Sequence, residues 1–394
     1  MKKVCFVMHS DLFTPWPVVR AMREIQILKE KGYDISVVSW IKEASDLPPT
    51  EERDGIKVHR FLLQPPKKGF LKRLFIYRKA LRGMSRKVME LKPDAIVCHD
   101  LEILNAGVKA KKTLKVPLFY DAHENWPAMV AENSRFEARF FDFLEKRLLR
   151  HVTHSYTYGD DLTEKFKGMG FFATTLYNSK SIDAVPSIAE AEIVGMKKQL
   201  GLEESDFVVG FAGSVSLENG AQQVIDCLKN LPENVKFLVV GGSGREEDLK
   251  KVKRYAIEKE VQDRVIMTGR VQSDALLKYT ATFDLGTALF QPLNPNQVAR
   301  VPNKLFDYMA LSVPMLVSDF PNMRRIVVEE SDCGLAVDPM NIGKIAQAIR
   351  NFYDNPVEAK KKGENGRTKF EELYSWDVQK KKLIASHPLW RGEG

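Results

Sequence analysis

The stretch from Gln297 to Ser318 places a lysine and a carboxylate at helical spacing just after a proline. Pro302 suits the first turn of a helix, because its fixed φ is helical and its missing N–H is one that the turn leaves unpaired anyway. The amides of Asn303 and Lys304, the helix dipole and the Lys304 ammonium then favour a bound diphosphate. Asp307 projects from the same face and can accept hydrogen bonds from a ribose diol. The alternative is an ordinary amphipathic helix with solvated charges.

Two glycine-containing loops follow expected strands in the second half of the chain. Gly213 and Gly220 flank the first loop and let its backbone approach a ligand closely. Ser214 and Asn219 offer neutral hydrogen bonds in the same loop. The second loop is the GGSG sequence at residues 241–244. Each loop also fits a plain strand-to-helix turn, and no spaced acidic residue completes a dehydrogenase fingerprint.

Ionisable residues also end an expected strand in the first half, where Asp121, His123 and Glu124 precede a loop. A histidine at the carboxyl end of a parallel strand is placed to face a ligand. A structural histidine is the alternative interpretation.

The segment from Pro65 to Met89 carries nine basic residues and no acidic one, with apolar residues between them. This composition suits a membrane-surface helix, where each cation contributes about 1 kcal/mol against anionic lipid. A domain helix with a core face and a solvated basic face fits equally well. Nucleic acid is disfavoured, because no helix-turn-helix, RNA-binding or zinc pattern accompanies the charge. The basic residues are Lys67, Lys68, Lys72, Arg73, Arg78, Lys79, Arg82, Arg86 and Lys87.

The composition predicts a globular protein of two domains. The chain has 394 residues, of which 44% are hydrophobic and 28% charged, and its net charge of +8 favours an anionic partner. No apolar run approaches the roughly 18 residues of a membrane span, and Met1–Ser10 lacks the long apolar region of a signal peptide. We therefore expect a cytoplasmic location. Four scattered cysteines support neither a zinc site nor a disulfide framework.

Apolar runs of strand length alternate with helical patterns in both halves of the chain. In the first half we expect strands at residues 4–8, 34–40, 56–61, 95–99, 117–122 and 154–158. In the second half we expect them at residues 207–213, 235–242, 264–269, 284–289 and 314–318. The fold class is therefore α/β, with two doubly wound parallel sheets and a ligand in the cleft between them. The domain boundary is expected near Tyr177–Ala191, where Pro186 interrupts the periodicity.

The order and spacing of these segments resemble the retaining glycosyltransferases of the GT-B fold, specifically family 4 of the nucleotide-sugar-dependent enzymes. The resemblance covers nearly the whole chain and implies two Rossmann-like domains facing across a cleft. It implies an acceptor-side domain at residues 1–185, a nucleotide-sugar domain at 186–372, and a final helix within 373–394 that crosses back. The segments that carry it are Val18–Val38, Tyr120–Pro127, Gly210–Gly220, Arg264–Val271 and Pro302–Pro314.

The resemblance implies roles for individual residues. Asp307 takes the place of the second glutamate of the family's E-x7-E signature and would hold the donor ribose. The first glutamate would fall at Ala299, which has no polar side chain for the transferred sugar. His123 matches the family's first-domain histidine and should contact that sugar. Arg270 and Val271 match the segment that recognises the base, largely through its backbone.

The site for the donor diphosphate departs from the family pattern. The basic pair that usually holds the diphosphate is replaced by Ser214 and Asn219. Arg300 and Lys304 are the nearest basic residues in sequence, so we assign charge compensation to them, beside Asn303. No D-x-D motif occurs in the chain, so neither a metal nor another cofactor is expected.

The chemistry implied is displacement of a nucleoside diphosphate from the anomeric carbon by an acceptor hydroxyl, with retention of configuration. The basic segment favours a lipid-linked or polysaccharide acceptor, reached in the cytoplasm or at the inner face of the membrane. Two other classes stay open: a sugar-nucleotide epimerase on the same fold, and a non-catalytic relative that binds a membrane or a partner. The residues assigned to the acceptor or membrane side are Arg20, Lys67, Lys68, Lys72 and Arg73.

Overall fold

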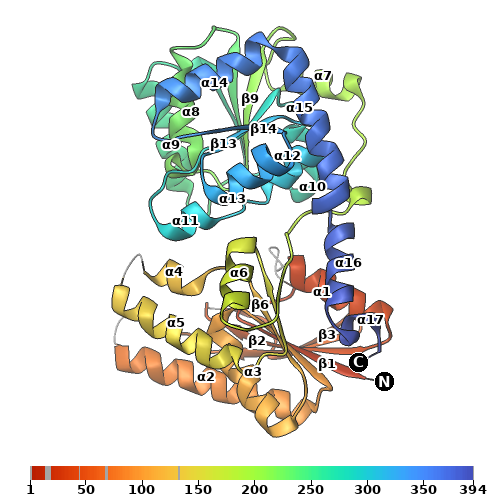
Figure 1. Ribbon diagram of the computed structural model, residues 1–394. Coiled ribbons are helices and arrows are strands. Elements are labelled where there is room, and N and C mark those ends of the chain that lie inside the picture. The colour runs from red at the N-terminus through yellow and green to blue at the C-terminus, as the bar shows by residue number, and fades with distance from the viewer. Residues whose placement is uncertain (1, 14–18, 44, 67–69, 132–133, 394) are drawn as a thin grey trace. The chain divides into compact units, whose positions relative to one another are not determined.

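The chain forms two compact units in the computed structural model, which describes residues 2–13, 19–43, 45–66, 70–131 and 134–393. The first unit comprises Met1–Asn178 together with Lys380–Gly394, and the second comprises Ser179–Gln379. Each unit has one sheet with helices on both faces (Figure 1). The second unit begins within the segment where the sequence predicts the boundary, and a few residues before the predicted start at 186.

The first unit has an eight-stranded sheet in the order β3-β4-β2-β1-β5-β6-β7-β8. All neighbouring strands are parallel except β3, which pairs antiparallel with β4. Central strands such as β1 are buried on both faces, which is why they read as continuous apolar runs. The strands are β1 (Lys3–Met8), β2 (Asp34–Ile41), β3 (Thr50–Arg53), β4 (Ile56–Leu62), β5 (Ala95–His99), β6 (Leu118–Ala122), β7 (His154–Thr157) and β8 (Ala173–Thr175).

Helices cover both faces of this sheet. Residues of α2, α3, α5 and α6 share one core cluster with one face of the strands. The end of the chain packs elsewhere in this unit, where the Trp390 ring contacts the rings of Phe119 and Tyr156. The helices are α1 (Val19–Glu30), α2 (Phe70–Leu91), α3 (Leu101–Leu114), α4 (Trp126–Val130), α5 (Arg135–Leu149), α6 (Asp160–Gly168), α16 (Trp376–Ser386), through which the division between the units passes, and α17 (Pro388–Arg391).

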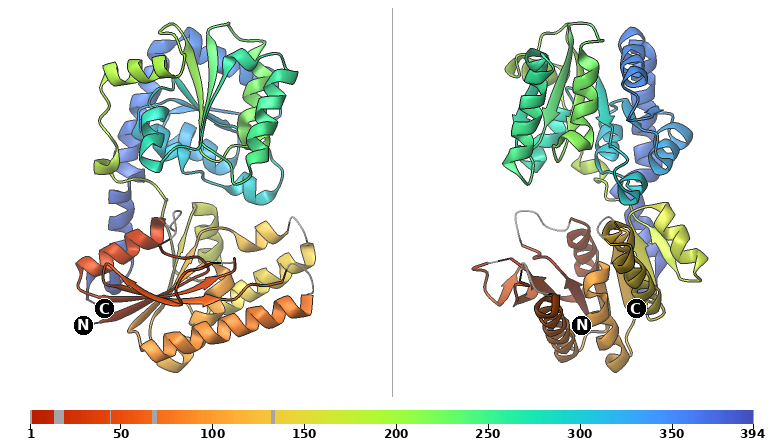
Figure 2. Two further views of the ribbon diagram at one scale, coloured as in Figure 1. Left: turned by 180° about the vertical axis from the view of Figure 1, so that it is seen from behind. Right: turned by 90° about the vertical axis from the view of Figure 1, so that its left-hand side faces the viewer.

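The second unit has a six-stranded, all-parallel sheet in the order β11-β10-β9-β12-β13-β14. Figure 2 shows its helices on both sides of the strands. The strands are β9 (Phe207–Ala212), β10 (Val235–Val240), β11 (Val265–Gly269), β12 (Leu285–Ala288), β13 (Met315–Ser318) and β14 (Gly334–Val337). The helices are α7 (Glu190–Gln199), α8 (Gln222–Leu228), α9 (Glu246–Glu258), α10 (Ser273–Thr280), α11 (Pro295–Ala299), α12 (Lys304–Ala310), α13 (Pro321–Arg324), α14 (Ile342–Asp354) and α15 (Pro356–Lys369).

The predicted α/β class with two doubly wound sheets is confirmed, and every strand predicted from the sequence is present. Three strands were not predicted: β3, β8 and β14. The helix after Pro302 begins at Lys304, because Pro302 and Asn303 form a preceding turn in which the Leu305 N–H donates to the Pro302 carbonyl. Within the described ranges, no helix is long and apolar enough to cross a bilayer.

Candidate functional site

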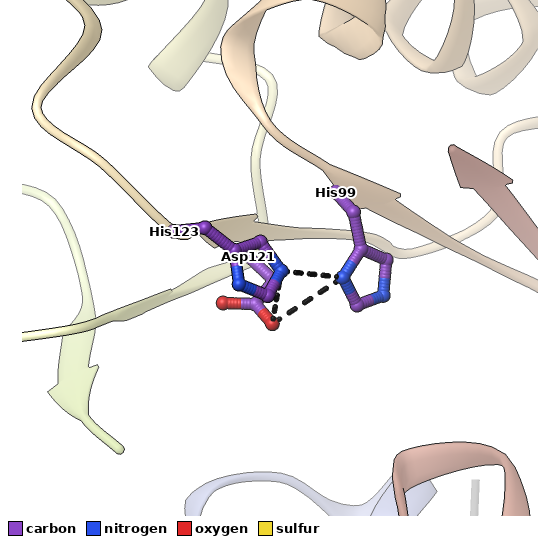
Figure 3. Close-up of side chains that lie close together, drawn as sticks. All are labelled: His99, Asp121 and His123. Atoms are coloured by element: carbon purple, nitrogen blue, oxygen red, sulfur yellow. Dashed lines mark hydrogen bonds and ion pairs between the residues drawn. The ribbon is translucent and has the colours of Figure 1, made fainter. Parts of the chain in front are cut away.

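The ends of two neighbouring strands in the first unit bring together an imidazole pair and a carboxylate. His99 ends β5 and lies opposite Asp121 of β6 in the sheet register. His123 follows one residue after β6, and its Nε2 lies 2.9 Å from Nδ1 of His99 (Figure 3). Asp121 Oδ2 lies 3.4 Å from His99 Nδ1 and 3.3 Å from His123 Nε2. The carboxyl ends of these neighbouring parallel strands therefore bring together side chains that lie apart in the sequence.

Arg20 of α1 closes this cluster. Its Nε donates to Asp121 Oδ2 at 2.7 Å, its Nη2 pairs with Asp121 Oδ1, and its Nη1 donates to the Leu176 carbonyl. The arginine side chain is only 2% exposed. Burial alone raises the pKa of Asp121, but Arg20 and the two histidines outweigh it and the pKa is lowered. Arg20, assigned from the sequence to the acceptor or membrane side, holds Asp121 in this structure, and its assigned role stays a prediction.

His99 connects this cluster to a second buried carboxylate. Its Nε2 lies 3.4 Å from Glu24 Oε2, and both residues are buried. Burial lowers the pKa of His99, but Glu24 and Asp121 overcome this effect and the pKa is raised. The pKa of Glu24 is raised, first by burial and then by the charge of Asp121. A proton shared between Glu24 and His99 is consistent with both shifts.

His123 has about a quarter of its side chain exposed, and both ring nitrogens face the cluster. Its Nδ1 lies 3.5 Å from Arg20 Nη2, and its backbone N–H donates to Asp100 Oδ1 at 3.1 Å. Burial, reinforced by the nearby positive charges of Arg20 and His99, lowers the pKa of His123 to about 3. Burial raises the pKa of Asp100 to about 6. His123 is therefore a neutral imidazole at physiological pH.

The same three side chains form a group that could hold a metal ion. One nitrogen of His99, one of His123 and one oxygen of Asp121 lie 2.9 to 3.4 Å apart, a spacing compatible with three ligands of one ion. The guanidinium of Arg20, however, already neutralises Asp121 and adds a positive charge beside His123. A divalent ion would bind against that charge, so the geometry favours a hydrogen-bonded network.

In the second unit, glycines let two loops approach each other at the carboxyl ends of β9 and β10. Gly213 and Gly241 have φ of 120° and 132°, values that favour glycine. A Cβ at Gly241 would overlap the Gly213 carbonyl oxygen. Gly220, with φ of 115°, lies in the π-helical turn Leu217–Ala221, and a Cβ there would come 3.0 Å from the Leu289 carbonyl. These loops therefore pack backbone against backbone, and the predicted close approach of their backbone to a ligand stays a prediction.

Lys304 lies directly beneath the Gly213 loop. A Cβ built on Gly213 would be 3.9 Å from the Lys304 Nζ. The ammonium is 3.3 Å from the centre of the Phe211 ring and 5.3 Å from that of Phe290. In the described part of the chain, no hydrogen bond or ion pair reaches this nitrogen. Burial first, and then the charge of Arg300, lower the Lys304 pKa well below its usual range.

Asp307 lies on the same short helix, α12, and is buried. Its Oδ1 accepts from Lys180 Nζ at 3.1 Å, an ion pair that the sequence does not suggest because 127 residues separate the partners. Asn303 is the N-cap residue of α12, but its side chain makes no capping hydrogen bond. Ala299 ends α11, and its carbonyl accepts from Asn322 Nδ2 at 2.6 Å.

Of the remaining predicted donor residues, Ser214, Arg270 and Val271 follow strand carboxyl ends, whereas Arg300 is the C-cap residue of α11. Ser214 is exposed, and its carbonyl accepts from Asn219 Nδ2 at 3.1 Å, which occupies one amide hydrogen of Asn219. Arg270 and Val271 come directly after β11, and Arg270 donates to the Ser243 carbonyl at 3.3 Å. The Arg300 guanidinium lies 4.9 Å from the centre of the Phe290 ring.

From Phe70 onward, the basic segment is part of α2, a helix of the first unit with two distinct faces. Ala80, Met84 and Val88 of α2 are buried in the core of the first unit. Lys72 is exposed on the opposite side. Lys67 and Lys68 lie outside the described residues, and nothing is described of the Arg73 side chain. Helix α2 therefore packs one face in the core and exposes its basic face to solvent. The basic face is accessible to a partner.

Several residues of both clusters were not predicted from the sequence. His99 could have been found, because it ends a predicted strand just as His123 follows one. Glu24 lies inside an amphipathic helix, where a single carboxylate gives no local signal. Phe211 and Phe290 read as ordinary core residues, although both rings lie under the Lys304 ammonium. Lys180 lies in a connecting segment without any motif.

Two family models match the chain, one for each half. Residues 17–176 match the model described as "Glycosyl transferase 4-like domain". Residues 195–369 match the model described as "Glycosyl transferases group 1". The clusters around His123 and Lys304 therefore lie within the segments that match these two glycosyltransferase models.

A curated relative is also a glycosyltransferase, and solved structures share the fold. The chain is 27% identical over 155 residues to "D-inositol 3-phosphate glycosyltransferase" of Xylanimonas cellulosilytica, an alignment that spans 39% of this chain but only 35% of that protein. Sucrose-phosphate synthase from Thermosynechococcus elongatus superposes with a TM-score of 0.78 at 15% identity, over 98% of this chain and 100% of the other. HepE of Anabaena, in complex with UDP-glucose, superposes with a TM-score of 0.72 at 16% identity, over 98% and 99% of the chains.

Proposed function

We propose that this chain, a GT-B glycosyltransferase in its fold and domain families, moves a sugar from a nucleoside diphosphate donor to a lipid-linked or polysaccharide acceptor. The observation that carries the proposal is the Lys304 ammonium. It lies under a glycine loop at the carboxyl edge of a parallel sheet, stacked on two aromatic rings. A desolvated cation without an anionic partner favours binding of a multiply charged anion.

The donor we propose is a nucleoside diphosphate sugar. A diphosphate beside Lys304 would restore the pKa that burial and Arg300 depress, because an anion favours the charged form of the amine. UDP-glucose bound to the Anabaena relative supports the class of ligand. Asp307 then holds the ribose diol, for which its ion pair with Lys180 must loosen or be shared. Arg270 and Val271 would face the base through their backbone.

In the reaction that we propose, the acceptor hydroxyl attacks the anomeric carbon while the bond to the diphosphate breaks. The main task of the protein is to stabilise the negative charge that develops on the leaving diphosphate. Lys304 and Arg300 supply the positive charges that do this. We propose retention of configuration, with the leaving phosphate accepting the hydroxyl proton. His123, as a neutral imidazole held by Arg20 and His99, contacts the transferred sugar after its ring turns away from the cluster.

The acceptor that we propose is lipid-linked and approached from the cytoplasmic side of a membrane. Support comes from α2, whose exposed face carries Lys72, Arg78, Lys79, Arg82 and Arg86. An anionic membrane or an acceptor diphosphate would neutralise these charges.

The test is to incubate the protein with a panel of sugar nucleotides, first chosen by thermal shift, with and without acceptor. A transferase releases nucleoside diphosphate only when acceptor is present, and the acceptor gains the mass of one sugar. An epimerase would convert the donor without acceptor, and a non-catalytic relative would bind without any conversion. Either of these two outcomes would overturn the proposal.

A further inference from the structure

Helix α5 carries a stripe of aromatic side chains that points to solvent. Phe136, Phe140 and Phe143 follow one another at spacings of four and three residues, so they lie on one face of the helix. Their exposed fractions are 82%, 53% and 63%. Single exposed apolar residues are common, but three aromatic rings on one helical face form a patch that marks an interaction surface. We call these three residues the aromatic stripe.

The aromatic stripe is not the face by which α5 packs in the core, because the opposite face of α5 already packs there. Leu148 and Leu149 are buried in the core of the first unit. Glu145 is buried and accepts from the Tyr120 hydroxyl, and the Lys165 ammonium lies 3.3 Å from its other oxygen. The helix is thus anchored on one side, and the aromatic stripe is left on the other.

The charges around the aromatic stripe are predominantly positive. Arg147 is exposed four residues after Phe143 and extends the stripe by one turn. Arg139, Lys146 and Arg150 are exposed along one side of it. Asp142 lies behind this side and is paired with Lys146 at 2.9 Å and with Lys165 at 3.1 Å. A surface that combines exposed aromatic rings with cations complements an anionic lipid headgroup layer.

Helix α2 presents the same combination in the same layer of helices (Figure 1). Phe75 is 66% exposed near its beginning, and basic side chains follow along its outer face. In chain order, α2 comes after β4, and α5 comes after β6 and α4. Both α2 and α5 contribute residues to the same core cluster of the first unit.

We propose that the aromatic stripe docks the first unit on an anionic lipid bilayer, with the three rings in the headgroup region and the basic residues against lipid phosphates. The proposal rests on the function inferred above, because it adds how a lipid-linked acceptor is reached. A second copy of the chain is disfavoured as the occupant, since two stripes brought face to face would juxtapose their arginines. An anionic lipid surface buries the aromatic rings and pairs with the basic side chains at the same time.

The test compares binding of the full chain to vesicles of 30% phosphatidylglycerol in phosphatidylcholine with binding to phosphatidylcholine alone. The parent should bind the anionic vesicles and release them as salt is raised. The triple variant Phe136→Ser, Phe140→Ser, Phe143→Ser should bind at least tenfold more weakly. Phe172→Ser is the matched control, because Phe172 is 76% exposed but precedes β8 and stacks on the His154 ring, so it is not part of the aromatic stripe. This control should bind like the parent.

Two results would overturn the inference: a parent that ignores anionic vesicles, or a triple variant that binds them as tightly as the parent does. Concentration-dependent dimerisation that the triple variant abolishes, without any vesicle binding, would assign the stripe to a second copy instead. Thermal shift by the sugar nucleotide, measured on the same samples without lipid, reports the donor site separately. Failure of vesicle binding with an intact donor shift would leave the glycosyltransferase function standing.

Discussion

At the scale of single residues, the candidate site of the second unit depends on one half-buried ammonium. The Lys304 Nζ lies over the Phe211 ring and close to Gly213, and Arg300 adds a second positive charge nearby. Cation–π contacts offset only part of the cost of desolvating an ammonium. We therefore expect a bound anion to relieve the unfavourable charge at this site.

Replacing Lys304 should separate recognition of the diphosphate from recognition of the nucleoside. Lys304→Ala should weaken binding of the nucleoside diphosphate about ten- to a hundredfold, because hydrogen bonds to charged groups are worth about 1.5–3 kcal/mol. Binding of the free nucleoside should change little. Titration calorimetry measures both, with Lys369→Ala as control, since Lys369 is paired with Glu372 on the surface of α15. Unchanged diphosphate affinity would remove Lys304 from the site.

Replacing Asp307 should affect every nucleotide alike. Asp307→Ala should weaken the nucleoside, the diphosphate and the sugar nucleotide by a similar factor, because the proposed contact is to the ribose. Lys180→Met removes the competing ion pair and should leave these affinities equal or tighter. If Lys180→Met weakens binding as much as Asp307→Ala does, the pair serves the local structure and the ribose contact is refuted.

The depressed pKa of His123 should appear in the pH dependence of stability. The folded state keeps this imidazole neutral down to about pH 3, whereas the unfolded state takes up a proton below pH 6.5. The stabilisation is therefore complete above pH 6.5 and is lost as pH falls towards 3. Between pH 7.5 and 5.5 the parent should lose about 1 kcal/mol relative to His123→Gln. Urea unfolding followed by tryptophan fluorescence measures this difference, and a pH-independent difference would contradict the assignment.

The sequence indicated which residues are candidates for the site, but not which residues they contact. His123 and Asp121 were recognised because they end a predicted strand. The pairing of Arg20 with Asp121 was not predicted, since it joins residues 101 positions apart and depends on how α1 crosses the sheet. Distant pairs of this kind have no local pattern, so only the fold identifies them.

At the scale of elements, the donor loops depend on glycines that permit close packing of backbone. Gly241→Ala should weaken donor binding and lower stability by about 1–3 kcal/mol, because its Cβ would overlap the Gly213 carbonyl at a φ of 132°. Gly244→Ala is the matched control, since its Cβ would meet nothing within 4 Å. Equal donor affinity and equal urea midpoints for both variants would show that the contact of the two loops is not required.

The three strands that were missed all lie at the edges of their sheets, whereas the edge strand β11 was predicted from its apolar run. The sequence of β3, TEER, is polar and lies at the edge of the sheet, so no apolar pattern reports it. The edge strands β8 and β14 are only three and four residues long. The helix of the signature segment was predicted at the right place, but its beginning moved to Lys304 because the preceding turn takes up Pro302 and Asn303.

At the scale of the whole molecule, the charge of the leaving diphosphate must be balanced by the protein or by a metal ion. We predict that turnover in excess EDTA stays within about twofold of turnover with Mg²⁺, because Arg300 and Lys304 supply two positive charges near the proposed diphosphate. Steady-state rates with and without EDTA, and after Mg²⁺ is added back, measure this effect. Loss of all activity in EDTA with full recovery on Mg²⁺ would show that these charges are insufficient.

The most direct test of the account is sugar transfer that depends on the Lys304 site. The parent and Lys304→Ala are incubated with the sugar nucleotide that gives the largest thermal shift, together with lipid-linked and saccharide acceptors. Mass spectrometry follows the acceptor, and released nucleoside diphosphate is quantified in parallel. The account predicts one added sugar per nucleoside diphosphate for the parent, no release without acceptor, and at least tenfold slower transfer by Lys304→Ala. Equal transfer by both proteins, or release by the parent that is independent of acceptor, would contradict it.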